Sequence, residues 1–320
     1  MITTDLKTLQ ESWRKNLDAL PATPDKIPAF FFGHGSPLLA MPPSSSGGDT
    51  RAWAGSGGPL SAFLKEFGPA LLNKYQPKGI VVFSAHWDTS GERLGPRPRA
   101  MTDYGDENPL LMDYYGFQPE LYQLKFKSKG DSALSKRVVE LYKQAGQLAR
   151  LSPKTESRGR DGRGFQGPGL DHGVFVPFAI MFGESFTSIP VVQVSIDASL
   201  SPEANWRLGK AVAALRDEGI LVIAGGLTVH NLGDFASFAP TSASPAHREF
   251  DRAIVAAVEV ADATQRKEAM VQLTKHHGFR AAHPREDHFI PLYVAAGAGE
   301  GGDVKVVADI YGCETIAFGL

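Results

Sequence analysis

Short apolar runs alternate with amphipathic segments along most of the chain. The runs GIVVF and ILVIAGG are apolar at nearly every position, which is typical of strands buried on both faces of a sheet. The segments between such runs repeat apolar residues every three or four positions, which is typical of amphipathic helices. We expect strands at 28–33, 79–84, 189–195, 220–224, 304–310 and 314–318. Helices are expected at 60–74, 132–145, 202–215, 246–260 and 290–296.

This alternation predicts the fold class. Strands that are separated by helices form a mainly parallel sheet, because each crossover returns the chain to the same end of the sheet. No linker divides residues 28–320, so we expect one α/β domain whose sheet is covered by helices on both faces. Residues 1–27 form a helical extension in which these apolar residues recur at helical spacing: Leu6, Leu9, Trp13, Leu17 and Leu20. We expect this helix to pack on the body of the chain rather than to form a dimerisation arm.

Three stretches rich in glycine, serine and proline interrupt the pattern, at 41–58, 152–169 and 236–246. Loops of this length in a compact domain are either mobile surface loops or a lid over a site. Because the first of them directly follows the turn GHGSP, we expect it to form a lid, with Arg51 and Trp53 as its contact residues.

The composition narrows the function classes. The 320 residues carry 33 lysines and arginines against 35 aspartates and glutamates, so no global positive charge favours nucleic acid or a membrane surface as a partner. No apolar run reaches the ~20 residues of a membrane span, and the N-terminus lacks the order of a signal peptide. The single cysteine, Cys313, excludes an intrachain disulfide framework and a multi-cysteine zinc site. We therefore expect a cytoplasmic protein.

Motifs of other enzyme classes find no support. No GxGxxG motif follows an expected strand, and GxxxxGK[ST] does not occur, so nucleotide binding is not indicated. GHGSP is not a GxSxG nucleophile elbow, because its serine does not stand at the centre. The arginines of SRGRDGRG, which are Arg158, Arg160 and Arg163, would either grip a substrate carboxylate or lie in a solvated loop.

Histidines carry the candidate chemistry. Three of the nine, His34, His86 and His230, follow apolar runs that we expect to be strands. In an open α/β sheet ligands bind outside the carboxyl ends of the strands, so these imidazoles could meet in one crevice. His288 lies at the entrance to an expected helix, and His172 ends a glycine-rich loop. Five histidines at such junctions favour a metal centre over separate structural residues.

The other four histidines are expected to be structural. His247 is expected to be a solvated residue of a helix, and His276 and His277 to lie in a surface turn. His283 is close to His288 in the sequence, which leaves a role at the site open.

Neutral imidazoles bind zinc and iron alike. Three histidines, or two histidines and a carboxylate, leave open coordination positions of the kind that non-haem Fe(II) oxygenases need. Glu286 and Asp287 directly precede His288, so the third ligand is open between these carboxylates and His288 itself. We prefer His288, because a neighbouring carboxylate could instead orient an imidazole as a hydrogen-bond acceptor.

Five motifs follow one another along the chain: GHGSP, SAHWD, LDHG, GGLTVHNL and EDHFIPL. Together they resemble the class III extradiol ring-cleaving dioxygenases, most closely the DOPA 4,5-dioxygenase-like branch, from about Ala29 to about Gly299. The resemblance implies a catalytic domain over 28–320 with a three-layer α/β/α fold and a non-haem Fe(II) cofactor, which zinc often replaces in purified protein. The long loop 41–58 and the extension 1–27 depart from the family pattern, and both affect the expected substrate rather than the chemistry.

The resemblance also implies roles for single residues. His34, His86 and His288 would bind the metal ion. His230 matches the active-site histidine that acts as acid and base and that in some members lies close enough to count as a ligand. His172 matches a histidine of the substrate pocket. Further substrate contacts are expected from three residues of the same motifs: Ser36, Trp87 and Asn231.

The activity that the resemblance implies is the opening of an aromatic ring. O2 would cleave a catechol beside its two hydroxyl groups to a muconic semialdehyde-type product, and His230 would take a proton from one hydroxyl. We expect a monomer or homodimer that binds a small catechol and O2, without nucleic acid or membrane. A non-catalytic metal-binding scaffold stays open. So does a zinc hydrolase, whose base would be one of four carboxylates: Asp88, Asp171, Glu286 or Asp287.

Overall fold

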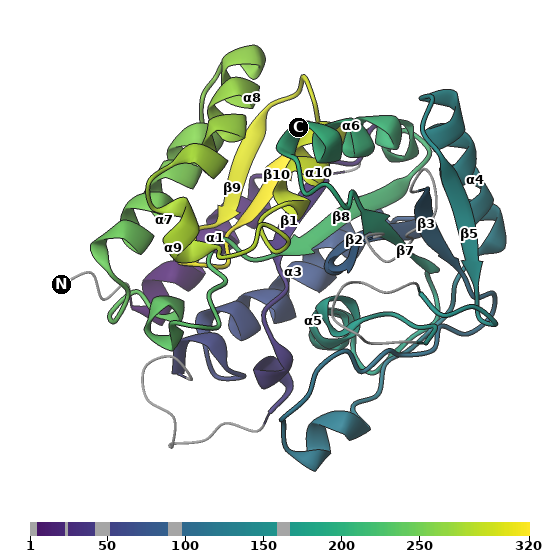
Figure 1. Cartoon of the computed structure of the whole chain (residues 1–320), viewed down its shortest axis with the longest axis horizontal. Coiled ribbons are helices and arrows are strands. Elements are labelled where there is room, and N and C mark those ends of the chain that lie inside the picture. The colour runs from purple at the N-terminus through teal and green to yellow at the C-terminus, as the bar shows by residue number, and fades with distance from the viewer. Residues whose placement is uncertain (1–4, 23–24, 42–51, 89–97, 159–166) are drawn as a thin grey trace.

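A sheet of eight strands forms the centre of the protein in the computed structural model, counted over the described residues 5–22, 25–41, 52–88, 98–158 and 167–320 (Figure 1). The strand order is β5-β3-β7-β2-β8-β1-β10-β9. The strands are β1 Ala29–Gly33, β2 Gly79–Asp88, β3 Arg99–Asp103, β5 Ala149–Pro153, β7 Val191–Ile196, β8 Ile220–Gly226, β9 Val304–Ala308 and β10 Thr315–Phe318. A separate parallel pair consists of β4 Lys127–Ser128 and β6 Ser185–Phe186.

The sheet is parallel at its centre and mixed at its edges. Strands β1, β8, β2 and β7 run parallel to one another, as the apolar runs predict. The pairings β3 with β7, β1 with β10 and β10 with β9 are antiparallel. The prediction of a mainly parallel sheet therefore holds for the four central strands. The eight-stranded sheet as a whole contains both parallel and antiparallel pairs.

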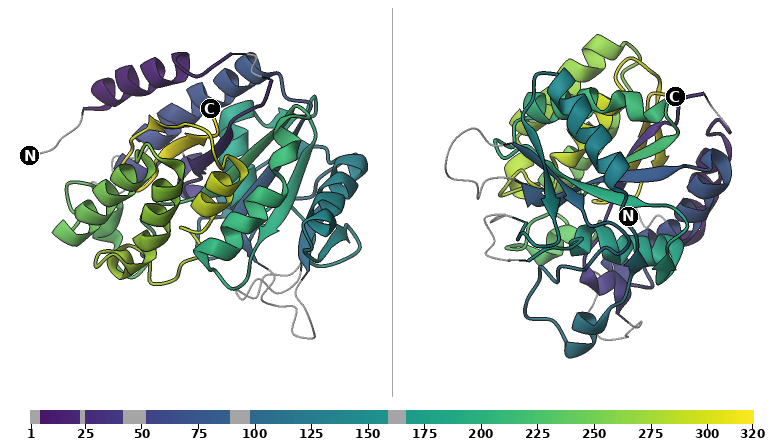
Figure 2. Two further views of the ribbon diagram at one scale, coloured as in Figure 1. Left: turned by 90° about the horizontal axis from the view of Figure 1, so that it is seen from above. Right: turned by 90° about the vertical axis from the view of Figure 1, so that its right-hand side faces the viewer.

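Helices cover both faces of this sheet (Figure 2). One face packs on α1 Leu6–Asp18, α3 Pro59–Tyr75 and α5 His172–Phe182. The opposite face packs on α4 Ser132–Gln144, α6 Pro202–Ala211, α7 Pro245–Val258, α8 Ala263–Gln272, α9 Phe279–Ala282 and α10 Pro291–Ala298. Strand β1 shows why two cores form, since Phe30 and Phe32 point to the first face and Phe31 points to the second.

The N-terminal helix α1 packs on the body of the same chain, as predicted. Trp13 and Leu17 are buried, and the ring of Trp13 meets the edge of Phe63 on α3 with centroids 5.6 Å apart. The Trp13 indole donates to Glu66 Oε2 at 3.1 Å. Among the described residues, no helix has the length and apolar character that crossing a bilayer requires.

Two kinds of element escape the sequence pattern. Helix α5 is apolar at nearly every position (HGVFVPFAIMF), so it shows no helical period although it is a buried helix. The short strands β3 and β5 carry polar residues, so they do not form apolar runs in the sequence.

The expected helix 202–215 is shorter in the structure. It ends as α6 at Ala211, and the chain continues as the 3-10 turn η3 Ala213–Arg216. Four further 3-10 turns are described: η1 Pro37–Ala40, η2 Pro119–Gln123, η4 Phe235–Phe238 and η5 Leu273–Lys275.

The proposed lid can be followed only in part. Residues 42–51, which include Arg51, lie outside the described residues. Trp53 is half-buried, and its indole donates to the backbone oxygen of Tyr311 at 3.2 Å. Arg160 and Arg163 of the second long loop also lie outside the described residues. The lid therefore stays a prediction.

Candidate metal centre

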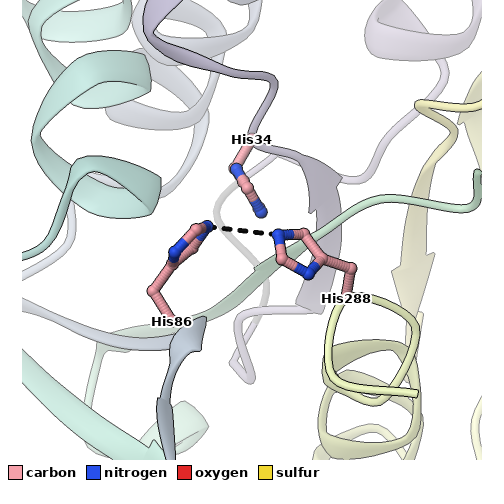
Figure 3. Close-up of side chains that lie close together, drawn as sticks. All are labelled: His34, His86 and His288. Carbon is pink, nitrogen blue, oxygen red and sulfur yellow. Dashed lines mark hydrogen bonds between the residues drawn. The ribbon is translucent and has the colours of Figure 1, made fainter. Parts of the chain in front are cut away.

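Three histidines from distant parts of the chain meet at one edge of the sheet (Figure 3). His34 directly follows β1, His86 lies near the end of β2, and His288 lies three residues before α10. Parallel pairing of Gly33 with Gly226 brings the carboxyl ends of β1 and β8 to the same edge. His34 and His288 come together at this edge with ring centroids 5.3 Å apart.

The three imidazoles are buried and converge on a common point (Figure 3). One ring nitrogen of each lies within 4.8 Å of one ring nitrogen of the other two. The centroid distance is 5.1 Å between His34 and His86 and 4.8 Å between His86 and His288. The exposed fractions are 1% for His34, 6% for His86 and 2% for His288, so the cluster is shielded from water.

Glycines allow the backbone to come this close. A Cβ at Gly33 would lie 2.7 Å from the backbone oxygen of Cys313, and a Cβ at Gly226 would overlap with the backbone oxygen of His288. The amide of Leu227 donates to that same His288 oxygen at 2.9 Å. The small residues of GGLTVHN are therefore needed where the segment that carries His288 crosses the end of β8.

Carboxylates determine which ring nitrogens face the centre. His86 Nδ1 lies 3.1 Å from Asp113 Oδ2, and His288 Nδ1 lies 3.0 Å from Asp287 Oδ1. An ionised carboxylate only accepts hydrogen bonds, so the hydrogen at each contact belongs to Nδ1, and a neutral ring then carries its lone pair on Nε2. These two Nε2 atoms lie 3.2 Å apart (Figure 3). Two lone pairs at this distance repel unless a proton, as in the hydrogen bond drawn in Figure 3, or a metal ion lies between them.

The donor set therefore fits a transition-metal ion. Two nitrogens that each lie about 2.0–2.1 Å from one ion are roughly 3 Å apart, which agrees with the 3.2 Å between His86 and His288. Three imidazoles with carboxylates bonded behind two of them are typical of zinc and non-haem iron sites. Of the alternatives for the third ligand, His288 faces the other two imidazoles, whereas Asp287 is bonded to its Nδ1 and Glu286 pairs with Arg280.

Asp113 is a residue of this centre that sequence reasoning missed. One oxygen of its carboxylate lies 3.1 Å from His86 Nδ1, an ion-pair contact, and the other is hydrogen-bonded to His172 Nδ1 at 2.8 Å. Burial alone would raise the pKa of this carboxyl, but the imidazoles of His172 and His86 hold it well below its ordinary value. The signal that could have revealed it is a single charge in the apolar stretch LLMDYYGF.

His172 and His230 border the cluster on two sides. His172 is the first residue of α5, and its ring lies 3.9 Å from that of His86 between centroids. His230 stacks on His288, with centroids 3.4 Å apart and ring planes 11° apart. A nitrogen of His230 also falls within 4.8 Å of ligand atoms of Asp287 and His288. The structure thus gathers all five histidines that the motifs single out.

The three expected substrate-contact residues have structural partners. Ser36 caps η1, accepting a hydrogen bond from the amide of Leu38 at 3.3 Å. Trp87 is buried, and the guanidinium of Arg158 lies 4.2 Å from its ring centroid. Asn231 donates to the backbone oxygen of Ala281 at 2.8 Å and accepts from Gly233 at 2.9 Å. Their contacts with a substrate stay predictions.

Two expectations about single residues are wrong. His247 is buried rather than solvated, because Nδ1 bonds Ser244 Oγ at 2.8 Å and Nε2 bonds the backbone oxygen of Ala281 at 3.0 Å. Arg158 is not a solvated loop residue, since it is buried in an ion pair of 2.9 Å with Asp171. His277, by contrast, is exposed as expected.

His283 has a structural place. It is fully buried, and its Nε2 lies 2.8 Å from the backbone oxygen of Thr228, two residues before His230. Burial lowers the pKa of this imidazole to about 3, so it is neutral and donates the bond. His283 therefore supports the loop that carries His230 rather than joining the metal cluster.

Comparison with protein families gives one match over most of the chain. Residues 28–318 match the family described as the catalytic LigB subunit of aromatic ring-opening dioxygenase. The fold resembles the crystal structure of an uncharacterized protein from Escherichia coli K12, with a TM-score of 0.61 and 24% identity over 92% of this chain and 100% of that one.

Three curated relatives carry similar names. The chain is 39% identical over 308 residues to a 4,5-DOPA dioxygenase extradiol-like protein of Schizosaccharomyces pombe, covering 96% of this chain and 97% of that protein. It is 28% identical over 291 residues to the 4,5-DOPA dioxygenase extradiol of Beta vulgaris, with 91% and 94% covered. It is 30% identical over 276 residues to that of Escherichia coli, with 86% of each chain covered.

Proposed function

The chain belongs to the LigB family and is an extradiol aromatic ring-opening dioxygenase, and from that premise we propose that it opens a catechol with O2 at an Fe(II) ion held by His34, His86 and His288. The product would be of the muconic semialdehyde type. The observation that carries the proposal is the convergence of three buried imidazoles, in which Nε2 of His86 and Nε2 of His288 lie 3.2 Å apart.

Iron bound there would supply a redox-active Lewis acid for the reaction between the catechol and O2. The protein's own contribution starts with shielding, because the buried imidazoles exclude bulk water from the reacting groups. Zinc bound to the same donors would lack the redox change that the reaction with O2 needs. We therefore propose iron rather than zinc as the active metal.

His230 is the proposed proton carrier. It is half-buried at the border of the cluster and stacked on His288, so its ring can reach both the centre and the solvent side. An imidazole titrates near neutral pH, so it can take a proton from a catechol hydroxyl and return one later. His172 is proposed to hydrogen-bond the substrate through Nε2, since its Nδ1 is bonded to Asp113.

The zinc hydrolase is disfavoured by the partners of its candidate bases. Asp171 accepts from Arg158, Ser84 and Gln193. Asp88 accepts from Arg285 at 2.7 Å, and Glu286 pairs with Arg280. Asp287 is bonded to His288. Carboxylates whose oxygens already accept these hydrogen bonds are not placed to take a proton from a metal-bound water.

The substrate class is proposed from the relatives. Since they are named as dioxygenases of DOPA, we propose a catechol with a carboxylate-bearing side chain, and DOPA itself is the first compound to test. We further propose a cytoplasmic location, which the single cysteine favours, and a monomeric or homodimeric state. The division into an extension over 1–27 and a catalytic domain over 28–320 stays a prediction.

Oxygen uptake tests this function. The protein is loaded anaerobically with Fe(II) and mixed with DOPA, caffeate, protocatechuate or gallate while O2 and product absorbance are followed. We expect stoichiometric O2 uptake and a yellow product with at least one catechol, and none from zinc-loaded protein. His230→Gln should retain iron but lose roughly 10²–10⁴-fold in kcat. Equal turnover by the zinc form, or no O2 uptake with any catechol, would overturn the proposal.

A further inference from the structure

The segment that carries Asp113 is held against the start of α5. Leu110 and Leu170 form an isolated parallel bridge, in which the amide of Leu111 donates to Leu170 at 2.8 Å. A Cβ at Gly169 would lie 2.6 Å from the backbone of Leu110, so only glycine allows this approach. The bridge thus places Asp113 directly beside His172, which lies two residues beyond Leu170.

The two oxygens of the Asp113 carboxylate face two different histidines, Oδ1 through hydrogen bonds and Oδ2 through an ion-pair contact. Oδ1 accepts from the backbone amide of His172 at 2.9 Å and from its Nδ1 at 2.8 Å. Oδ2 lies 3.1 Å from Nδ1 of His86. The side chain of Asp113 is 0% exposed, so bulk water does not compete for these contacts. Asp287 differs in that its Oδ1 lies 3.0 Å from Nδ1 of the neighbouring residue, His288.

These contacts dictate tautomers. A carboxylate accepts and does not donate, so the hydrogen in each contact belongs to the imidazole nitrogen. Both rings then carry their hydrogen on Nδ1 and a lone pair on Nε2. For His86 this lone pair faces Nε2 of His288, which is where a metal ion would be held. For His172 it makes Nε2 the hydrogen-bond acceptor of the ring.

We propose that Asp113 is a positioning residue that sets the tautomer of two histidines at once, so that Nε2 of His86 binds the metal ion and Nε2 of His172 accepts a hydrogen bond in the pocket. This inference rests on the proposed function for the presence of the metal. Because one carboxylate serves both rings, the orientation of the proposed ligand and that of the pocket histidine are coupled. Carboxylates behind metal-binding histidines change metal affinity by 10–100-fold in other proteins.

The substitution Asp113→Asn distinguishes a role in orienting the histidines from a role in packing alone. Asparagine has nearly the same shape, but it presents one oxygen and one NH2 group. The oxygen should replace Oδ1, because two donors of His172 converge there. The NH2 group would then face Nδ1 of His86, which must accept instead of donate. His86 would carry its hydrogen on Nε2 and could no longer bind the metal through that atom.

The test uses zinc, so that no turnover is needed. In the zinc-loaded protein labelled with 15N-histidine, NMR should show Nδ1–H and a metal-bound Nε2 for His86, and Nδ1–H for His172, with His172→Gln for assignment. Asp113→Asn should bind zinc about 10–100-fold more weakly in competition with a chelating dye. Asp103→Asn is the matched control, since the carboxylate of Asp103 accepts a hydrogen bond from Ser132, and its zinc affinity should not change.

Two results would overturn the inference. One is wild-type protein in which His86 or His172 carries its hydrogen on Nε2, which needs no variant and so does not depend on whether Asp113→Asn folds. The other is folded Asp113→Asn with wild-type zinc affinity. Failure of the proposed function looks different, because zinc would then bind with the expected tautomers while the iron-loaded protein opened no catechol.

Discussion

His86 and His288 are 202 positions apart in the sequence, yet their Nε2 atoms lie 3.2 Å from each other. A carboxylate holds each ring from behind, Asp113 for His86 and Asp287 for His288. Both rings therefore turn a lone pair toward the other. This arrangement is suited to sharing a cation, and it is the basis of the metal centre proposed above.

Removing one imidazole of the cluster should release the metal. His34→Ala or His86→Ala leaves two of the three proposed ligands, so we expect iron and zinc contents close to zero after gel filtration in metal-free buffer. His277→Ala is the control, because His277 is exposed and pairs with Glu249 at the surface. Elemental analysis measures the iron and zinc content of each variant. A full metal content in His86→Ala would exclude His86 as a ligand.

A methyl group at Gly173 should disturb the cluster from behind. A Cβ there would lie 2.8 Å from Ser84 Oγ and 2.9 Å from Cδ2 of His86. We expect Gly173→Ala to lower the free energy of unfolding by about 1–3 kcal/mol and to weaken metal binding, because the ring of His86 must move. Gly57→Ala is the control, since nothing lies within 4 Å of a Cβ at Gly57. Urea unfolding of both variants measures the free energy of unfolding. Equal midpoints for Gly173→Ala and the wild type would contradict this account.

Arg158 is predicted to stabilise the fold rather than to bind substrate. Its guanidinium pairs with Asp171 at 2.9 Å, with side chains 3% and 1% exposed. Arg158→Ala leaves the Asp171 carboxylate without this partner, so the free energy of unfolding should fall by about 3–5 kcal/mol. Lys7→Ala removes an exposed pair and should change it by less than about 1 kcal/mol. Unchanged stability with a KM raised tenfold would instead assign Arg158 to the substrate.

Glu314 should make the protein less stable as the pH rises. Burial, and then the carboxylate of Asp251, raise the pKa of Glu314 well above its ordinary value, and Thr228 donates to it. The folded state therefore keeps a proton that the unfolded chain loses above pH ~4.3, which lowers the free energy of unfolding by about 1.4 kcal/mol per pH unit up to the folded pKa.

Glu314→Gln replaces the titrating carboxyl group with an amide, so this contribution to the pH dependence of stability is lost. The variant should be more stable than the wild type at pH 8, and the difference should shrink toward pH 5. Glu268→Gln, on the exposed side of α8, is the control and should show no such trend. Chemical unfolding at several pH values provides the comparison, and a constant difference between Glu314→Gln and the wild type would refute the assignment.

The sequence predicts the central strands well and singles out the five histidines that the structure brings together, because both have local signals. Strands such as β8 are apolar throughout, and each of the five histidines stands beside a small or polar residue within a few positions of the end of a strand or helix. The local pattern fails where burial is complete, as in α5, because a helix that is apolar on all sides has no period.

Asp113 and Arg158 show the limit of sequence reasoning at the site. The bonds of Asp113 depend on the bridge between Leu110 and Leu170, which joins segments 60 positions apart. The burial of Arg158 depends on Asp171 and on the ring of Trp87. Both interactions arise from tertiary contacts, which a pattern of single residues does not encode.

The metal centre itself is tested most directly by diffraction at the iron edge from crystals loaded anaerobically with Fe(II). We predict one anomalous peak at about 2.0–2.3 Å from a ring nitrogen of each of His34, His86 and His288. A peak at a different group, such as the acidic residues Asp251, Asp309 and Glu314, with no peak among the three imidazoles, would contradict the account.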